Sequence, residues 1–375
     1  MNVNQPLRGV FHVKQGKSIN EVAQELERQA KYYKDFRAPT RQLHTIADGD
    51  SIRLLGLGPK DKDYGDDDRI YDRSTENPVL TKHALRQIGS NQNIPAKYVD
   101  KMMDKAPQLL AENINHWFEK EPSVRLVRLN EHGVRAYLSD RYRIIDNMQI
   151  AEYVLPIISE HPDLEIISCD VTDSKLYIKA VTPKIKGEVV VGQEVQAGVT
   201  ITNSEIGLSS VSVKPLAYFL WCKNGCTTDK GLSKYHIGKA SNENHIHEIL
   251  ADDTLKADDT ALMLKLRDVL IASLDQVQFD KSLNKFRTAQ EIKIGNPMKA
   301  VELVEKRGWI SKEEGESVLQ HLIQGGDLSA FGMSSAITRT SQDIASYDRA
   351  SQLEDLGGTI IELPKTAWTD LSIAA

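Results

Sequence analysis

The chain has 375 residues, which is more than one compact core usually holds, so we expect two or three structural modules. Hydrophobic residues make up 40% of the chain and charged residues 27%, as in an ordinary globular protein. The formal net charge of −6 argues against a dedicated duplex-DNA binder, since such proteins are usually basic overall. Any contact with nucleic acid must therefore use positive charge that is gathered locally.

The cysteine content and the lack of long apolar runs indicate a cytoplasmic protein. Three cysteines, at positions 169, 222 and 226, are too few and too uneven for a disulfide framework and suit a reducing compartment. No apolar run approaches the ~20 residues of a membrane helix, and the N-terminus lacks the apolar core of a signal peptide. We expect no membrane partner.

Residues 1–120 are predicted to be a helical N-terminal region with an acidic loop. Ser18 and Glu21 form a Ser-x-x-Glu capping box that starts a helix predicted to reach Phe36, and residues 52–57 resemble a short strand. Residues 60–73 are rich in aspartate but lack the glycine and glutamate that a calcium loop requires. We expect a surface loop there.

Two short helices are predicted between Thr81 and Asp104, because Thr81 can cap the first and Pro95 can open the second. Their outline resembles a helix-turn-helix, but the second helix offers few exposed donors. A simple packing unit is the favoured interpretation.

Residues 121–230 are predicted to be an antiparallel β-sheet core. Two apolar runs joined by Asn130-Glu-His-Gly133 indicate one hairpin, and a helix capped at Asp146 or Asn147 follows. Further strands are predicted at residues 164–171, 175–181, 188–202 and 209–213. This order favours the α+β class: a mostly antiparallel sheet backed by a helix, with helical N- and C-terminal regions.

Residues 231–375 are predicted to be helical. Apolar residues between Leu262 and Val277 indicate one long helix, Pro297 opens another, and Ser311 with Glu314 forms a second capping box. A last helix is predicted at 341–356 and a final strand at 359–363.

The two hairpins carry the candidate binding residues. If Ala136 and Leu138 face the helix, then Arg135 and Tyr137 face water, because side chains alternate along a strand. An open face with interleaved cations and rings is what a single-strand platform requires. An ordinary exposed sheet face remains the alternative. The candidate nucleic-acid-binding residues are Arg125, Arg128, Arg135, Tyr137, Arg141, Tyr142, Arg143, Lys175, Tyr177 and Lys179.

Other chemistry is weakly indicated. Cys222 and Cys226 could hold zinc together with histidines at positions 236, 245 and 247, but the Cys-x-x-x-Cys spacing is weaker than Cys-x-x-Cys. Glycine-rich phosphate loops and the Gly-x-Ser-x-Gly motif are absent from the sequence. Asp170 and Glu205 are the likeliest carboxylates near the sheet, yet nothing pairs them. We therefore predict no metal, no cofactor and no catalytic residue.

Several stretches resemble a phage- and plasmid-borne family of unknown function. The resemblance lies in Ala-Tyr-Leu-Ser-Asp-Arg-Tyr-Arg at 136–143, Ile-Asp-Asn at 145–147, and segments at 202–208, 222–225 and 332–358. Ile206 stands where that family usually has threonine. The resemblance implies a mobile-element origin and a sheet core similar in outline to phage single-strand annealing proteins. Fold-level likeness of this kind does not fix function.

The leading hypothesis is a non-catalytic protein of a phage or plasmid that binds and anneals single-stranded DNA. Annealing needs a long continuous groove, so we expect a homo-oligomer in the host cytoplasm. Two alternatives stay open: an interaction protein that acts on host machinery, and an unrecognised nucleic-acid-processing enzyme. Clustering of Asp170, Glu205 and a histidine in one cleft would favour the enzyme.

Overall fold

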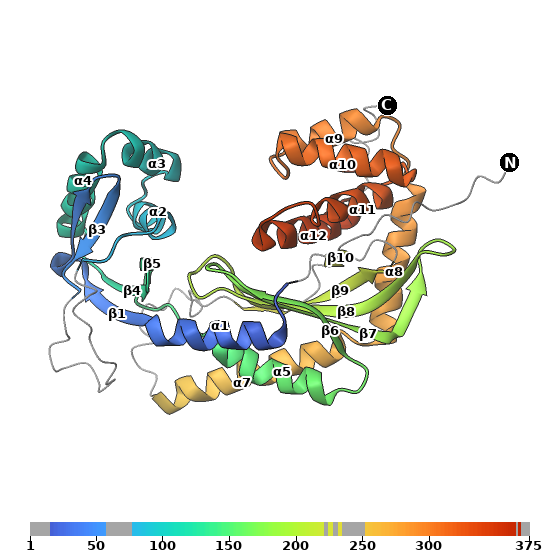
Figure 1. Cartoon of the computed structure of the whole chain (residues 1–375), viewed down its shortest axis with the longest axis horizontal. Coiled ribbons are helices and arrows are strands. Elements are labelled where there is room, and N and C mark those ends of the chain that lie inside the picture. Colours follow the sequence, from blue (N-terminus) through green and yellow to red (C-terminus); the bar gives the residue numbers. More distant parts are fainter. Residues whose placement is uncertain are drawn as a thin grey trace.

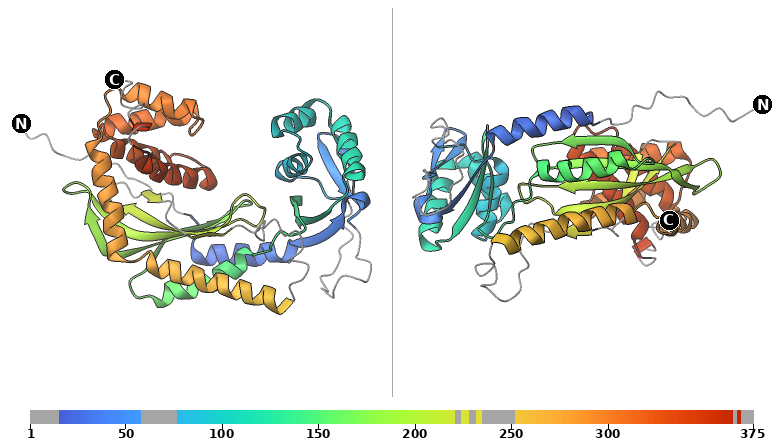
Figure 2. Two further views of the ribbon diagram at one scale, coloured as in Figure 1. Left: turned by 180° about the vertical axis from the view of Figure 1, so that it is seen from behind. Right: turned by 90° about the horizontal axis from the view of Figure 1, so that it is seen from below.

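The chain adopts a U shape in a computed structural model, which describes residues 16–57, 77–220, 224–227, 232–234, 252–364 and 367–368. An N-terminal lobe and a group of C-terminal helices rise from the same side of a central sheet and stand apart (Figure 1, Figure 2). The predicted α+β class is confirmed, because antiparallel sheets lie between helical regions at both ends of the described chain.

The secondary structure follows this order. The helices are α1 (Ile19–Tyr32), α2 (Lys82–Asn91), α3 (Ala96–Lys105), α4 (Pro107–Lys120), α5 (Asn147–Glu160), α7 (Asp252–Ala272), α8 (Gln276–Glu291), α9 (Pro297–Lys306), α10 (Lys312–Gly325), α11 (Ala330–Thr340) and α12 (Tyr347–Glu362). The strands are β1 (Lys34–Pro39), β2 (His44–Asp48), β3 (Ser51–Leu55), β4 (Val124–Asn130), β5 (Gly133–Ser139), β6 (Glu165–Val171), β7 (Leu176–Glu188), β8 (Glu194–Asn203), β9 (Val211–Phe219), β10 (Asn224–Thr227) and β11 (Leu232–Lys234).

The N-terminal lobe is built on the antiparallel sheet β1-β4-β5. Phe118 of α4 packs in one core with Val127 of this sheet. The predicted turn between β4 and β5 is confirmed. Gly133 there has a φ of +135°, and a Cβ on it would lie 2.2 Å from the carbonyl oxygen of Val79. Only glycine fits this position, which explains why the turn ends on it.

The central sheet has the strand order β10-β9-β8-β7-β6, with β11 paired to β9. One face packs on α1, α5 and α7, where Ile178 of β7, Val154 of α5 and Leu266 of α7 share a core. The other face lies under the C-terminal helices, as Figure 1 shows for α11 and α12. Aromatic contacts join these helices to the sheet: the Phe219 ring centroid lies 5.9 Å from that of Phe331.

The two hairpins do not share a sheet, contrary to the prediction of a single sheet core. Strand β4 pairs with β1, so residues from the first predicted region complete the sheet of the first hairpin. The helix that begins at Ser18 ends at Tyr32 rather than Phe36, because the chain then becomes β1. The N-terminal lobe therefore contains residues from both sides of position 120.

Two predictions in the C-terminal region are wrong. The helix predicted across 262–277 is broken, because Asp275 caps a new helix by accepting a hydrogen bond from the Gln278 N–H. The final strand predicted at 359–363 is part of α12, which runs through Gly357 and Gly358. A Cβ on Gly358 would lie 1.7 Å from the Thr227 carbonyl oxygen, so this glycine allows close packing and does not end the helix.

Candidate functional site

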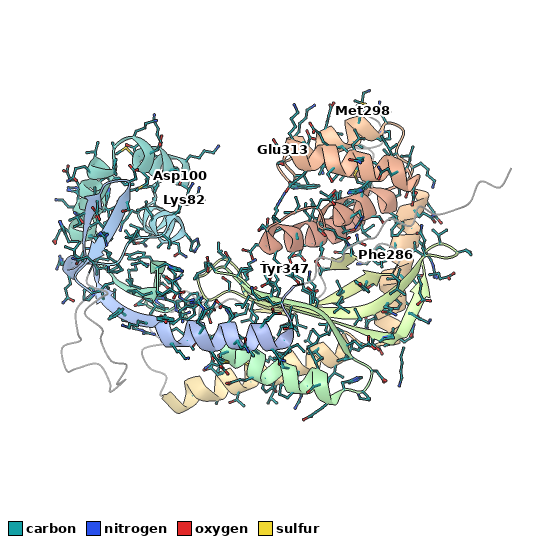
Figure 3. All side chains as sticks on the ribbon, in the orientation of Figure 1. Lys82, Asp100, Phe286, Met298, Glu313 and Tyr347 are labelled. Carbon is teal, nitrogen blue, oxygen red and sulfur yellow. The ribbon has the colours of Figure 1, made fainter. Side chains whose placement is uncertain are left out.

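Strand β7 carries three of the predicted site residues, and the alternation predicted along it is correct. Ile178 faces the apolar core beneath the sheet, and Tyr177 and Lys179 face the opposite side. The expectation that this opposite face is open to water is wrong. Tyr177 is 2% exposed and Lys179 6%, because α12 lies over them. Figure 3 shows Tyr347 of α12 directed toward the sheet.

Lys179 is held in a buried ion pair. Its Nζ donates to Oε2 of Glu354 at 2.5 Å and lies 5.0 Å from the centre of the Tyr347 ring. Burial alone would lower the pKa of Lys179, but Glu354 and Tyr347 outweigh it and hold the pKa above its ordinary value. The Tyr347 hydroxyl lies 2.6 Å from the Ser168 hydroxyl. The charge of Lys179 is thus fully used within the protein.

Tyr177 is fixed by the first turn of α12. Its hydroxyl donates to Oδ1 of Asp348 at 2.8 Å, and the Thr172 hydroxyl donates to the same oxygen at 2.9 Å. Burial and then the Asp348 carboxylate raise the pKa of Tyr177, so it stays protonated and keeps donating. A cavity of about 30 Å³ lies nearby. That volume holds about one water molecule, so it leaves no room for a base to stack.

Lys175 lies at the edge of this covered face. It is half-buried and forms no ion pair with a residue that the structure describes. Burial lowers the pKa of Lys175, and the nearby Asp348 and Asp355 oppose that effect. The neighbouring Lys214 is already occupied, since its Nζ lies 3.2 Å from Oδ2 of Asp355. Lys175 therefore keeps an amine that a ligand could reach.

Arg128 of the first hairpin is buried in a network of acceptors. Its guanidinium donates to Asp35 at 2.9 and 3.0 Å, to Asp146 at 2.8 Å, and to the backbone oxygen of Glu205 at 2.9 Å. Burial alone would lower the pKa of Arg128, but the two aspartates outweigh it and raise the pKa. The expected outward-facing cation is therefore a buried one.

Arg135 is buried because β5 is irregular at this residue. In the register, Leu129 pairs with Val134 and Arg128 with Ala136, so Arg135 is the extra residue of a bulge. The bulge breaks the alternation on which the outward placement of Arg135 was based. Its Nη1 donates to Glu205 at 2.7 Å.

The remaining faces of the Arg135–Glu205 pair are also covered. The Arg135 guanidinium lies 3.5 Å from the centre of the Tyr33 ring. Glu205 accepts a second hydrogen bond, from the Asn147 N–H at 2.6 Å. The pair thus links α1, the first hairpin, α5 and the segment that follows β8.

Tyr137 and Tyr142 are buried as well. Tyr137 stacks on Phe118 of α4, with ring centroids 6.1 Å apart. Tyr142 donates its hydroxyl proton to the Ser204 backbone oxygen at 3.0 Å. The expectation that these rings stack on bases is wrong, because both lie in contacts that hold the lobe together.

The other three arginines differ from one another. Arg143 forms ion pairs with Asp258 and Asp259 of α7, which fastens the start of α5 to that helix. Arg125 is half-buried, and its Nε donates to the Ser123 hydroxyl at 3.0 Å. Arg141 is exposed. Arg125 and Arg141 form no ion pair with a described residue, so the acidic partners account for which cations the sequence interpretation misplaced.

The acidic partners are the residues that sequence reasoning missed. Asp35, Asp146, Glu354 and Asp348 lie outside the predicted hairpin faces, in β1, before α5 and in α12. One usable signal was present: Asp348 and Asp355 recur at helical spacing with Glu354 beside them. This pattern marks a helix face that needs cationic or hydroxyl partners.

The other candidate sites are largely settled by position. The acidic loop at 60–73, Cys222 and the three histidines at 236–247 lie outside the described residues. Within the described part of the chain, no three histidine, cysteine, aspartate or glutamate side chains are grouped to hold a metal. Asp170 pairs with Lys17 and Glu205 with Arg135, so the two carboxylates lie in separate ion pairs.

Comparisons of the chain with protein-family models, with curated proteins and with solved structures return no match. The resemblance to a phage- and plasmid-borne family therefore stays a prediction. None of the helices in the described ranges has the length and apolar character needed to cross a bilayer.

Proposed function

We propose that the protein binds single-stranded DNA without reacting with it, at the joint between the N-terminal lobe and the central sheet. The joint comprises residues 139–147, which link β5 to α5, and residues 203–208, which follow β8. The observation that carries the proposal is a group of cations around the joint that form no ion pair with a described residue. These are Lys82, Arg125, Arg141 and Lys175.

Arg141 and Lys175 flank one chain of contacts across the joint. The Tyr142 hydroxyl donates to the Ser204 backbone oxygen at 3.0 Å, and the Ser204 hydroxyl donates to the Ser174 backbone oxygen at 2.9 Å. Arg141 precedes Tyr142 in the chain and Lys175 follows Ser174. The two cations therefore come from the lobe and from the sheet but border the same contact.

Arg125 and Lys82 extend the group on the lobe. Arg125 pairs across the hairpin with Ser139, which lies just before Arg141. Lys82 precedes His83, whose Nε2 lies 2.9 Å from the backbone oxygen of Ile206 in the joint. Figure 3 shows Lys82 on the side of the lobe that faces the C-terminal helices.

This arrangement supports contact with phosphates and no stacking of bases. Tyr137, Tyr142 and Tyr177 are buried, so the aromatic half of the predicted platform is not available. The cations come from α2, the hairpin and the start of β7, which point in different directions. A single strand can bend to follow them, whereas duplex DNA stays stiff over about 150 base pairs. We therefore favour single-stranded DNA as the ligand.

Fluorescence anisotropy of a labelled oligothymidylate at several salt concentrations tests the proposal. Binding should weaken with salt, with a slope of roughly −0.7 in log–log form for each phosphate neutralised. The double variant Arg141→Gln and Lys175→Gln should lose about 0.7 of slope for each lost contact. Lys306→Gln is the matched control, since Lys306 is 72% exposed on α9. Absence of binding at low salt would refute the proposal.

Annealing is the further step of this proposal, and it needs neighbouring copies of the chain to hold two strands. We propose that copies associate on DNA so that their joints form one path. Light scattering with and without oligothymidylate measures this association. Strand binding by a protein that stays monomeric on long DNA would retain the binding function and reject annealing.

A further inference from the structure

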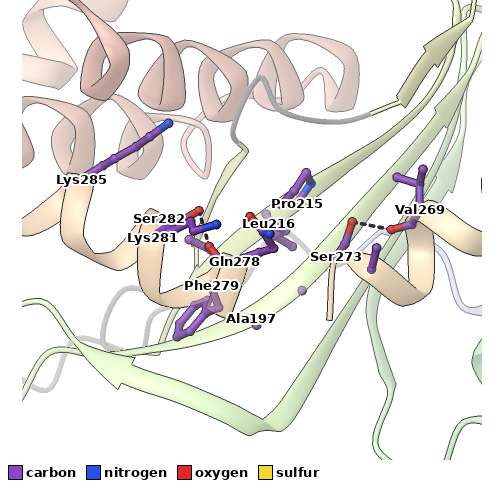
Figure 4. Close-up of a pocket in the computed structure, with 13 residues that line it drawn as sticks. Ala197, Pro215, Leu216, Val269, Ser273, Gln278, Phe279, Lys281, Ser282 and Lys285 are labelled. Carbon is purple, nitrogen blue, oxygen red and sulfur yellow. Dashed lines mark hydrogen bonds between the residues drawn. The ribbon is translucent and has the colours of Figure 1, made fainter. Parts of the chain in front are cut away.

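The largest cavity among the described residues lies away from the joint, in the corner where α7 turns into α8. It has a volume of about 420 Å³, at the lower end of the range for small-molecule sites. It opens between this corner and strands β8 and β9 (Figure 4). It is therefore large enough for a small organic ligand.

Small side chains create this cavity. Ala197 and Gly198 of β8, Ala217 of β9 and Ala272 of α7 contribute little volume to its walls. Gly198 is needed for a separate reason, since a Cβ on it would lie 2.5 Å from the Ala180 backbone oxygen. The cavity lies where the core beneath the sheet gives way to the core of the C-terminal helices. Neither core fills it.

The walls are of two kinds. Pro215, Ala217, Val269 and Ala272 make apolar walls from the sheet and α7. The opposite wall is a polar stripe on one face of α8. The stripe consists of Gln278, Lys281, Ser282 and Lys285, which recur at helical spacing. A ligand that fits both walls has an apolar body and a polar end.

The charge of the stripe selects the sign of that polar end. Lys285 forms an ion pair with Glu362 and extends toward the C-terminal helices in Figure 4. Lys281 is exposed and forms no ion pair with a described residue. Two amines and one carboxylate leave a net positive charge at the rim. That charge attracts an anion and repels a cation.

We infer that this cavity binds a small amphipathic anion, with its apolar body against β8, β9 and α7 and its carboxylate beside Lys281. The class is that of a medium-chain carboxylate. Burial of an aliphatic body supplies the affinity, at about 0.8 kcal/mol for each CH₂ group removed from water. Lys281 contributes orientation and a modest electrostatic gain, since exposed ion pairs are weak.

Calorimetric titration of the full chain with decanoate, decanol and decylamine tests the inference, in the absence of DNA. We expect decanoate to bind more tightly than decanol, and decylamine not to bind. Lys281→Met should weaken decanoate binding by up to about fivefold and leave decanol binding unchanged. Lys299→Met on α9 is the matched control. Its lysine is likewise exposed and forms no ion pair with a described residue.

A second variant keeps the test independent of charge. Ala272→Leu fills the cavity from its exposed rim and should abolish decanoate binding while the unfolding temperature stays the same. Failure of decanoate to bind the wild type would overturn the inference, as would equal binding of decanoate and decanol or unchanged binding by Ala272→Leu. None of these results depends on DNA binding, so they leave the proposed function untouched.

Discussion

The two faces of the central sheet are both covered, but by different chemistry. Beneath the sheet, Leu176 and Ile178 pack into an apolar core with α5 and α7. Above it, Tyr177 and Lys179 meet Asp348 and Glu354 of α12. Apolar burial tolerates imperfect partners because it is non-directional, whereas each buried polar group needs its own acceptor or donor. The upper face is therefore the more easily damaged of the two.

This difference explains how a basic and aromatic strand can be mistaken for a binding surface. Alternation along β7 identifies which residues share a face, and it does so correctly. The cover over that face comes from a helix 175 residues later, where Glu354 meets Lys179. Sequence pattern within one strand carries no information about such a distant partner.

Removal of one member of the buried pair should have the largest effect. Glu354→Ala leaves the Lys179 ammonium buried without a partner, so we expect a loss of about 3–5 kcal/mol in the free energy of unfolding. Urea denaturation followed by circular dichroism measures it. Glu302→Ala on α9 is the control, because its side chain is 56% exposed and the expected change is within about 0.5 kcal/mol. Equal urea midpoints for Glu354→Ala and wild type would mean that Lys179 is solvated.

Glu205→Gln extends the comparison to the N-terminal lobe and should cost about 2 kcal/mol. The amide keeps the shape of the side chain but replaces a charged acceptor for Arg135 and the Asn147 N–H. Glu131→Gln is a matched change in a surface pair with Arg28, which should cost less than about 1 kcal/mol. Urea midpoints of the two variants give the comparison. An equal loss in both would show that burial does not distinguish the two pairs.

Tyr177→Phe should cost about 1 kcal/mol, because it removes one hydrogen bond to Asp348 and keeps the ring. The thermal midpoint of unfolding should fall accordingly. Tyr98→Phe on α3 is the control, since that ring is 50% exposed and its loss of a hydroxyl should have no measurable effect. A wild-type midpoint for Tyr177→Phe would argue that α12 does not cover this tyrosine.

Lys175→Met should give the smallest change, with the opposite sign. Burial lowers the pKa of Lys175 below its ordinary value of 10.5. Between the two values the unfolded chain binds more protons, so wild-type stability rises with pH there. Below that window the wild type carries the cost of a partly buried charge. The variant should therefore be slightly more stable at neutral pH, and its advantage should shrink as the pH approaches 10.5.

Thermal midpoints of both proteins across neutral and alkaline pH check this behaviour. Lys82→Met on α2 is the control, since Lys82 is exposed and its replacement should give no advantage that changes with pH. A wild type that is more stable than Lys175→Met at neutral pH would reveal an acidic partner for Lys175. That result would also remove Lys175 from the proposed strand-binding group.

Local features of the fold were predictable because their causes are local. The capping boxes at Ser18–Glu21 and Ser311–Glu314 both form, and Pro297 opens α9. The turn before Gly133 forms for the same reason, since it depends on backbone conformation within a few residues. These elements need no information from distant parts of the chain.

The site was less predictable because its decisive contacts are distant. The bulge at Arg135 redirects a side chain, and nothing in the alternating pattern of β5 marks it. Gly358 resembles a helix end in sequence but is a close packing contact with Thr227 from β10. Arg141 was predicted as a cation of the site and is exposed, whereas Arg128 is buried among aspartates far from it in sequence.

The most direct test of the account compares strand binding by three proteins across a salt series: the wild type, Lys179→Met with Glu354→Leu, and Arg141→Gln with Lys175→Gln. The first double variant replaces a buried pair with apolar side chains, and the second removes cations at the joint. The account predicts that the buried-pair variant binds oligothymidylate as the wild type does, while the joint variant binds weakly with a shallower salt slope. Loss of binding in the buried-pair variant alone, or no binding by the wild type at low salt, would contradict it.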